Sequence, residues 1–165
     1  KFSLNHRIGL NPRFNNVGYT WSDNSQVIFA VRKVISVENT LTAKYNFTNM
    51  MGINMRIRHY SSSVDNKEFY NLQQSDGSLV RNTSFNTNKN QNVNFFNVDM
   101  VYTWQFAPGS FLNVVWKNAI FDYTDVVEKS YFKNFGNTIE ADQNNNISLK
   151  VIYFLDYLQL KKKKH

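Results

Sequence analysis

Two histidines and a group of loop carboxylates are the residues in this chain whose types suit metal or acid–base chemistry. His6 and His59 fall on the apolar sides of predicted strands, where packed histidines are commoner than metal ligands. Asp122, Asp125 and Glu128 have a spacing that could hold Ca²⁺, but they lack the glycine and the alternating oxygen ligands of a recognised calcium loop. We therefore assign no metal, cofactor or catalytic residue, and an enzyme using these carboxylates is the weakest of three interpretations.

Several other kinds of chemistry are excluded or disfavoured by composition. The absence of cysteine excludes disulfides, thiolate metal sites and cysteine nucleophiles. The chain shows no nucleophilic serine elbow and no glycine-rich phosphate loop. The net charge of +7 depends on a basic tail at residues 161–165, and without its four lysines 15 basic residues face 12 acidic ones. The remaining basic residues are scattered, so nucleic acid is not an expected partner.

Charged residues also fall on the polar sides of predicted strands. They are Arg56, Arg58, Asp99, Lys117, Lys150 and Asp156. If the strands form a barrel, these side chains would face its watered lumen. They could bias the passage of anions or form a salt-bridged plug, and a narrow barrel favours the plug.

Alternation with a period of two predicts the strands that position these groups. Even-numbered residues are apolar from Phe2 to Leu10, and the alternation is sharpest from Phe96 to Phe106. Further strands are predicted over 37–47, 53–60, 112–117 and 147–157, with an interrupted pattern between 17 and 47. Scarce alanine and leucine beside abundant asparagine exclude a helical bundle, and 16% aromatic residues exclude disorder. The fold class is therefore all-β and antiparallel.

Connection lengths and strand lengths indicate an up-and-down transmembrane β-barrel over residues 1–160. Short turns are predicted at 13–16, 48–52 and 107–110, and long polar loops at 61–91, with a small hairpin, and 122–146. This alternation and strands of about nine to eleven residues are typical of outer-membrane barrels. About seven strands result, or eight if 17–47 hides another. Because bacterial barrels have even strand numbers, the chain is either a complete eight-stranded barrel or, as we expect, the end of a larger one.

Aromatic residues beside the short turns and near the end of the chain would form an interfacial girdle in such a barrel. The candidates are Phe47, Trp104, Phe106, Phe111, Tyr153 and Tyr157. The alternative is a soluble all-β carbohydrate-binding module. It would bind glycans through its Asn-rich loops and the loop aromatics Tyr70, Phe85, Tyr131 and Phe135.

Local sequence also resembles a known family. The segments 27–34, 37–41 and 51–61, together with 104–112 and 148–157, are similar to the C-terminal region of a Bacteroidota family of unknown function. In that family a barrel-like domain follows a carbohydrate-binding family 9 module, which this chain does not contain. The resemblance implies an outer-membrane location and a longer parent protein, and it transfers no catalytic residue.

Taken together, these observations predict the C-terminal part of a larger outer-membrane barrel that anchors or gates the handling or export of surface glycans. Its expected partners are outer-membrane lipid, the rest of its own barrel or another outer-membrane or periplasmic chain, and glycan.

Overall fold

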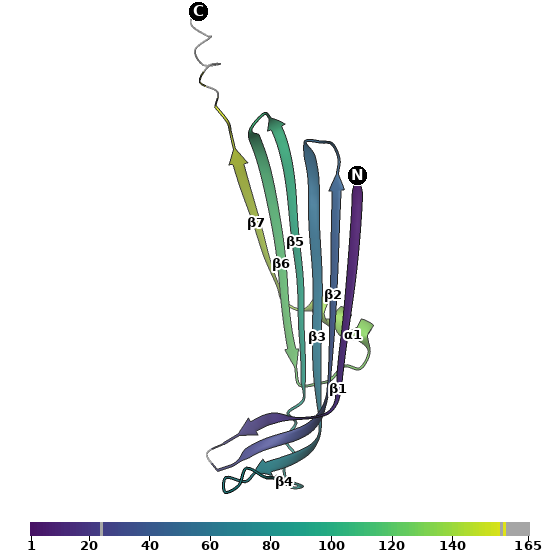
Figure 1. The fold of residues 1–165 in the computed structure, drawn as a ribbon, viewed down its shortest axis with the longest axis vertical. Helices are drawn as coiled ribbons and strands as arrows, with labels where there is room; N and C mark the ends of the chain where they lie inside the picture. The colour runs from purple at the N-terminus through teal and green to yellow at the C-terminus, as the bar shows by residue number, and fades with distance from the viewer. Residues whose placement is uncertain (24, 156, 158–165) are drawn as a thin grey trace, which may run out of the picture.

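A computed structural model describes residues 1–23, 25–155 and 157 as one antiparallel sheet with a single short helix. The elements are β1 (Phe2–Ser22), β2 (Val27–Asn46), β3 (Met51–Leu72), β4 (Leu79–Arg81), β5 (Gln91–Ala107), β6 (Ser110–Thr124), α1 (Tyr131–Glu140) and β7 (Gln143–Ile152). The long strands lie in the order β1-β2-β3-β5-β6-β7, and β4 pairs with β3 (Figure 1). The predicted all-β antiparallel class is confirmed. Over the described residues the sheet is open, with β1 and β7 at its edges.

The long strands have two different ends. At one, which we call the turn end, tight turns join β2 to β3 and β5 to β6, as predicted for 48–52 and 107–110 (Figure 1). Gly109 takes the positive φ of 73° that the second turn requires. At the other, the loop end, lie the β1–β2 connection and the segments that contain β4 and α1. No helix in the described part of the chain is long and apolar enough to cross a membrane.

The turn predicted at 13–16 is wrong, because these residues form a bulge within β1. The pairing with β2 shifts between Arg13 and Asn16, and Asn15 has a φ of 54°. Arg32 fixes the bulge by donating to the Asn16 side-chain oxygen at 2.9 Å. Its guanidinium lies against Gly18, where a Cβ would come within 2.2 Å of Nη2. Proline and asparagine here bend the strand instead of reversing it, and the loop end of β1–β3 leans away from the sheet (Figure 1).

Three other boundaries differ from the prediction. β2 is one continuous strand, and β3 continues to Leu72 through a serine-rich stretch in which the Ser36 and Ser62 hydroxyls lie 3.1 Å apart. The predicted loop 61–91 is therefore shorter, although its small hairpin is present as β3–β4. The predicted loop 122–146 contains α1 and the first residues of β7. β7 ends at Ile152, not at 157.

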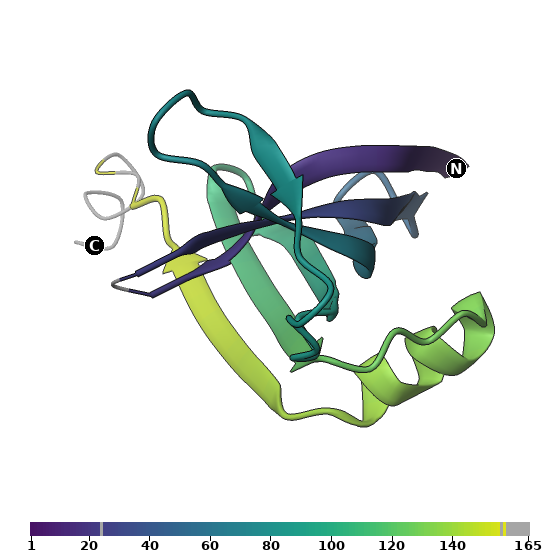
Figure 2. The same cartoon turned by 90° about the horizontal axis from the view of Figure 1, so that it is seen from below.

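The two faces of the sheet differ in what covers them. We call the face that carries Ile53, Ile57 and Phe96 the helix face, because α1 lies against its loop end, to one side of the sheet (Figure 2). The other is the opposite face. The apolar band consists of the helix-face residues nearest the turn end. Its members are Phe2, Leu4, Ile8, Leu10, Leu41, Ala43, Tyr45, Ile53, Met55, Ile57, Val98, Met100, Tyr102, Trp104, Leu112, Val114, Trp116, Ile147, Leu149 and Val151.

Candidate functional site

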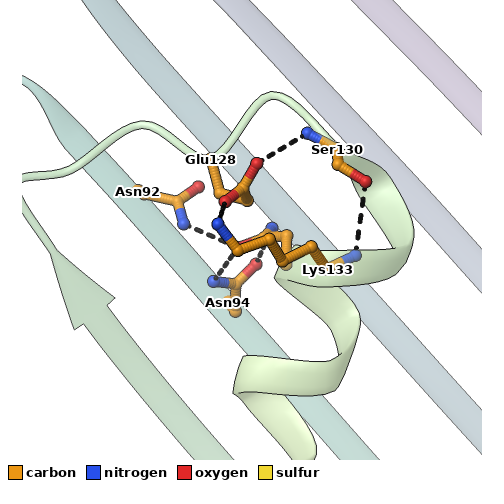
Figure 3. A network of polar contacts seen from close by, with 6 residues as sticks. Asn92, Asn94, Glu128, Ser130 and Lys133 are labelled. Atoms are coloured by element: carbon orange, nitrogen blue, oxygen red, sulfur yellow. Dashed lines mark hydrogen bonds and ion pairs between the residues drawn. The ribbon is translucent and has the colours of Figure 1, made fainter.

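The start of α1 is fixed by polar contacts in the loop that precedes it. Ser130 is the N-cap, and its hydroxyl accepts from the Lys133 backbone N–H at 3.5 Å. Glu128 accepts from the Ser130 N–H at 2.9 Å and pairs with the Lys133 ammonium at 2.8 Å (Figure 3). The hydrogen bond from Lys133 lowers the pKa of Glu128, and the same contact raises the pKa of Lys133. These contacts cap the first turn of α1.

Three buried asparagines connect α1 to β5. The Asn134 Oδ1 accepts from the side-chain amides of Asn92 at 2.7 Å and Asn94 at 3.1 Å, and Asn134 donates back to Asn94 at 2.7 Å (Figure 3). Their exposed fractions are 1%, 0% and 5% for Asn92, Asn94 and Asn134. A buried amide network of this kind aligns a helix with the sheet more specifically than apolar packing would. We call Asn92, Asn94 and Asn134 the amide cluster.

Tyr131 forms the second connection. Its hydroxyl accepts from the Asn39 side-chain amide at 2.7 Å and lies 3.0 Å from His59 Nδ1. Burial raises the pKa of the Tyr131 hydroxyl, although the hydrogen bond from Asn39 opposes this effect. The Phe135 ring stands edge-on to His59 at 5.0 Å and to Phe96 at 5.8 Å. α1 therefore reaches β2, β3 and β5 through side chains only.

Two hollows flank α1. The first, which we call the polar hollow, has a volume of about 210 Å³ and lies beside the start of the helix. It is lined by Lys33, Ile35, Val37, Ser61, Ser63, Asp65, Asn92, Val127, Glu128, Lys129, Tyr131 and Asn134. Asn92 Oδ1 is buried there without a hydrogen-bond partner. The second is an open apolar hollow of about 680 Å³, lined mainly by the band residues of β1–β3, Phe96 and the α1 aromatics.

The charged residues predicted to line a lumen share the opposite face. Arg56 lies directly across from Asp99, which pairs with Arg58 at 3.5 Å and is opposite Lys117 on β6. Lys150 lies on the same face of β7, opposite Asn113. Asp156 and the tail 161–165 lie outside the described residues. The five described residues thus form a charged surface on the side of the sheet away from α1.

Most of the predicted girdle aromatics gather at the turn end. The Trp104 and Phe106 rings are 5.8 Å apart, and Phe106 stacks on Tyr153 at 6.2 Å. Phe47 stands edge-on to Tyr45 at 4.9 Å. Tyr157 lies beyond the end of β7 and is exposed.

Phe111 is the exception among these aromatics. It pairs with Gln105 and Ile152 and projects from the opposite face. Phe111 does lie beside a turn, as predicted, but the alternation along β6 places its ring on the opposite face and not on the helix face.

The residues considered for metal binding have separate partners. Asp122 accepts from Asn94 at 3.3 Å, Asp125 accepts from Asn88 at 3.3 Å, and Glu128 pairs with Lys133. His6 lies opposite Leu41 on the far side of β2 from His59. Among the residues that the structure describes, no group of three or more histidine or acidic side chains is placed to hold a metal ion.

The amide cluster was missed by sequence reasoning, which assigned asparagine to loops and polar faces. A usable signal was nevertheless present. Asn92 and Asn94 have the same parity as Phe96, Val98 and Met100, so they continue the helix face beyond the apolar band. Polar residues on the apolar side of a strand indicate a covering element with polar groups of its own.

A family model described as "Domain of unknown function (DUF5916)" matches residues 1–164. No curated protein and no solved structure matches the chain.

Proposed function

Given that this chain belongs to the DUF5916 family of domains of unknown function, we propose a role based on the geometry of its sheet. The sheet is the C-terminal part of a larger outer-membrane β-barrel, which anchors or gates the handling or export of surface glycans. The observation that supports this role best is the apolar band, which covers one face of six adjacent strands and lies back to back with the charged opposite face.

The dimensions of the band suit a bilayer. On β1 it runs from Phe2 to Leu10, and nine residues at about 3.3 Å each span roughly 30 Å along the strand. Strands tilted at about 35° would reduce this to the roughly 25 Å height of the apolar belt on outer-membrane barrels. Leu4, Ile8 and Leu149 are 56%, 65% and 67% exposed. Such a surface is stable in hydrocarbon and unfavourable in water.

The opposite face suits a watered interior. Around the middle of the band it carries Arg56, Arg58, Asp99 and Lys117, whose charges alternate across β3, β5 and β6. Charges on a lipid-facing side would each cost about 2–4 kcal/mol at the bilayer midplane. Their confinement to one face therefore supports an assignment of that face to the lumen, where the Arg58–Asp99 pair could contribute to a plug.

The two edges of the sheet support a larger assembly. Within hydrocarbon, each unpaired backbone group on β1 or β7 would cost several kcal/mol. We propose that both edges pair with further strands, from the same parent protein or from another outer-membrane chain. The resemblance to Bacteroidota proteins with a carbohydrate-binding family 9 module supports a glycan-related role for that parent.

The test is the behaviour in membranes of the parent protein that contains this sheet. We expect purification to require detergent and migration in SDS gels to change on heating, because a closed hydrogen-bonded barrel resists SDS until it is melted. Protease should spare the band strands in outer-membrane vesicles and cut the loop-end segments first. A monodisperse protein in plain buffer, without detergent, would contradict this role.

A soluble all-β carbohydrate-binding module is the second candidate, and the polar hollow beside Tyr131 favours it. Of the loop aromatics, Tyr131 and Phe135 belong to α1, whereas Phe85 packs against Trp21 and Phe69 on the bent extension. Glycan-array binding by detergent-free protein would support this candidate. Retention of the protein in the membrane fraction after a high-salt wash would contradict it.

A further inference from the structure

One residue that lines the polar hollow beside α1 has a buried side-chain oxygen with no hydrogen-bond partner. Asn92 is 1% exposed, donates to Asn134 through Nδ2, and leaves Oδ1 unpaired. An unsatisfied buried acceptor carries a free-energy cost, because it has lost its hydrogen bonds to water. A ligand that supplies an O–H or N–H donor to Asn92 Oδ1 would remove this cost.

The charges around the hollow restrict which ligand fits. Two lysines, Lys33 and Lys129, and two carboxylates, Asp65 and Glu128, line it together, and the carboxylates are already paired with Lys67 and Lys133. An anion would meet the Asn92 lone pairs and both carboxylates, and a metal cation would meet the ammonium groups. A neutral molecule with several hydroxyl groups avoids both conflicts, because each hydroxyl both donates and accepts hydrogen bonds.

The other walls of the hollow are apolar. Ile35, Val37 and Val127 contribute aliphatic surface, and Tyr131 stands at the boundary with the apolar hollow. A pyranose ring has C–H faces for such walls and hydroxyl groups around its edge for the polar ones. The volume of about 210 Å³ limits the ligand to about one ring.

We propose that the polar hollow binds a single sugar residue, one of whose hydroxyl groups donates to Asn92 Oδ1 while Lys129 donates to a second oxygen. The residue is either a free monosaccharide or the terminal unit of a glycan, since both present the same chemistry. This inference rests on the glycan-related part of the proposed function and gives it a location. It does not depend on whether the band lies in lipid.

Two arms of one experiment test the inference with the full chain in detergent. In the first, glucose, galactose, mannose and N-acetylglucosamine are titrated separately by calorimetry and by saturation-transfer NMR. In the second, immobilised glycans ending in the same sugars are probed. We expect at least one of these sugars to bind, with a dissociation constant of about 1–10 mM for the free form. If only the immobilised glycans bind, the ligand of the hollow is the terminal residue of a glycan and not a free monosaccharide.

The matched variants are adjacent residues in the loop before α1. Val127→Trp fills the hollow and should weaken binding by more than about tenfold, whereas Val126→Trp alters a neighbouring side chain that is 66% exposed and should leave binding unchanged. Lys129→Ala should weaken binding several-fold without affecting the sheet. Circular dichroism of each variant checks that the fold is retained.

Absence of sugar binding in both arms by folded protein would overturn the inference, as would equal binding by the two tryptophan variants. Preferential binding of inorganic phosphate would also overturn it. None of these results changes heat-modifiable migration, which tests the membrane role separately.

Discussion

The turn end and the loop end of the same strands have opposite surfaces. At the turn end the helix face is apolar and largely exposed, and the opposite face is charged. At the loop end the helix face is lined by Asn92, Asn94 and Asn118 and is partly covered by α1, whereas the opposite face carries the Tyr60, Phe95 and Phe121 rings, which are tilted against one another. One β-sheet thus presents two environments along its length.

This difference shows how the strands are divided. An exposed apolar surface is suited to lipid, so in the proposed membrane role only the turn-end half of each long strand would lie in the membrane. The amide-lined half is suited to water and to a packed helix, because its buried polar groups find partners in α1. If the proposed role is correct, the strands are long because one half anchors the protein and the other supports the proposed binding site.

The largest expected effect distinguishes the two faces within the band. In vesicles, Met100→Arg on the helix face should lower the free energy of unfolding by about 2–4 kcal/mol, because it places a charge in hydrocarbon. Val101→Arg, the neighbouring residue on the opposite face, should cost less than about 1 kcal/mol. Urea unfolding of the reconstituted protein measures both. Equal costs would mean that the helix face is not against lipid.

The next effect concerns the loop end alone. Asn134→Leu removes the group shared by Asn92 and Asn94 and should cost about 1–3 kcal/mol, because both buried amides lose a partner. Hydrogen exchange should show faster opening of α1 and unchanged protection in the turn-end half of β5. Asn137→Leu, on the exposed side of α1, is the control. If hydrogen exchange became faster to the same extent throughout β5, the loop end and the turn end of the sheet would not open independently.

A pair of glycine substitutions should give opposite signs at the two ends. Gly109→Ala should destabilise by about 1–2 kcal/mol, because its φ is 73° and the new Cβ would lie 2.9 Å from Phe154 Cβ. Gly136→Ala lies within α1 with nothing inside 4 Å and should stabilise the helix by up to about 1 kcal/mol. Thermal unfolding and helix exchange measure the two changes. Stabilisation by Gly109→Ala would contradict the turn geometry.

The smallest effect is the pH dependence of the α1 start. The pKa of Glu128 is lowered in the folded protein. Its contribution to the stability of the α1 start is therefore present above the ordinary value of 4.5 and is lost as pH falls through the lowered pKa. The pKa of Lys133 is raised in the folded protein. Its contribution to the stability of the α1 start is therefore present below the ordinary value of 10.5 and is lost as pH rises through the raised pKa. Amide protection at the first turn should be greatest between these limits. Glu128→Gln should remove the loss of amide protection at low pH.

Alternation along the chain was sufficient to predict the sheet and the faces of its clearest strands. From Phe96 to Phe106 each residue lies on its expected side, and the tight turn with Gly109 follows where predicted. These features are local: side-chain parity follows from the strand itself, and the turn from proline and glycine chemistry. For the same reason, Arg56, Arg58, Asp99, Lys117 and Lys150 share one face, whereas their role in a lumen stays a prediction.

Tertiary contacts decided the features that were predicted wrongly. Pro12 and Asn15 form a turn in many sequences, but pairing with β2 on both sides makes them a bulge here. Ser61–Ser63 continue β3 because β2 and β5 flank them. The segment around Asn134 has weak helical propensity, and contacts with Asn92 and Asn94 stabilise its helix. Such partners are distant in sequence, so local pattern could not identify them.

The order of the strands has a consequence for how this protein folds. Every pair of neighbouring long strands is also consecutive along the chain, apart from the small β4 between β3 and β5. The sheet can therefore grow by adding one strand at a time, and the β1–β2, β2–β3 and β5–β6 additions each close a short loop at low entropic cost. α1 is different, because it docks on β2, β3 and β5 after β6 has been made. We expect the polar hollow to be completed last, once the sheet that supports it is already in place.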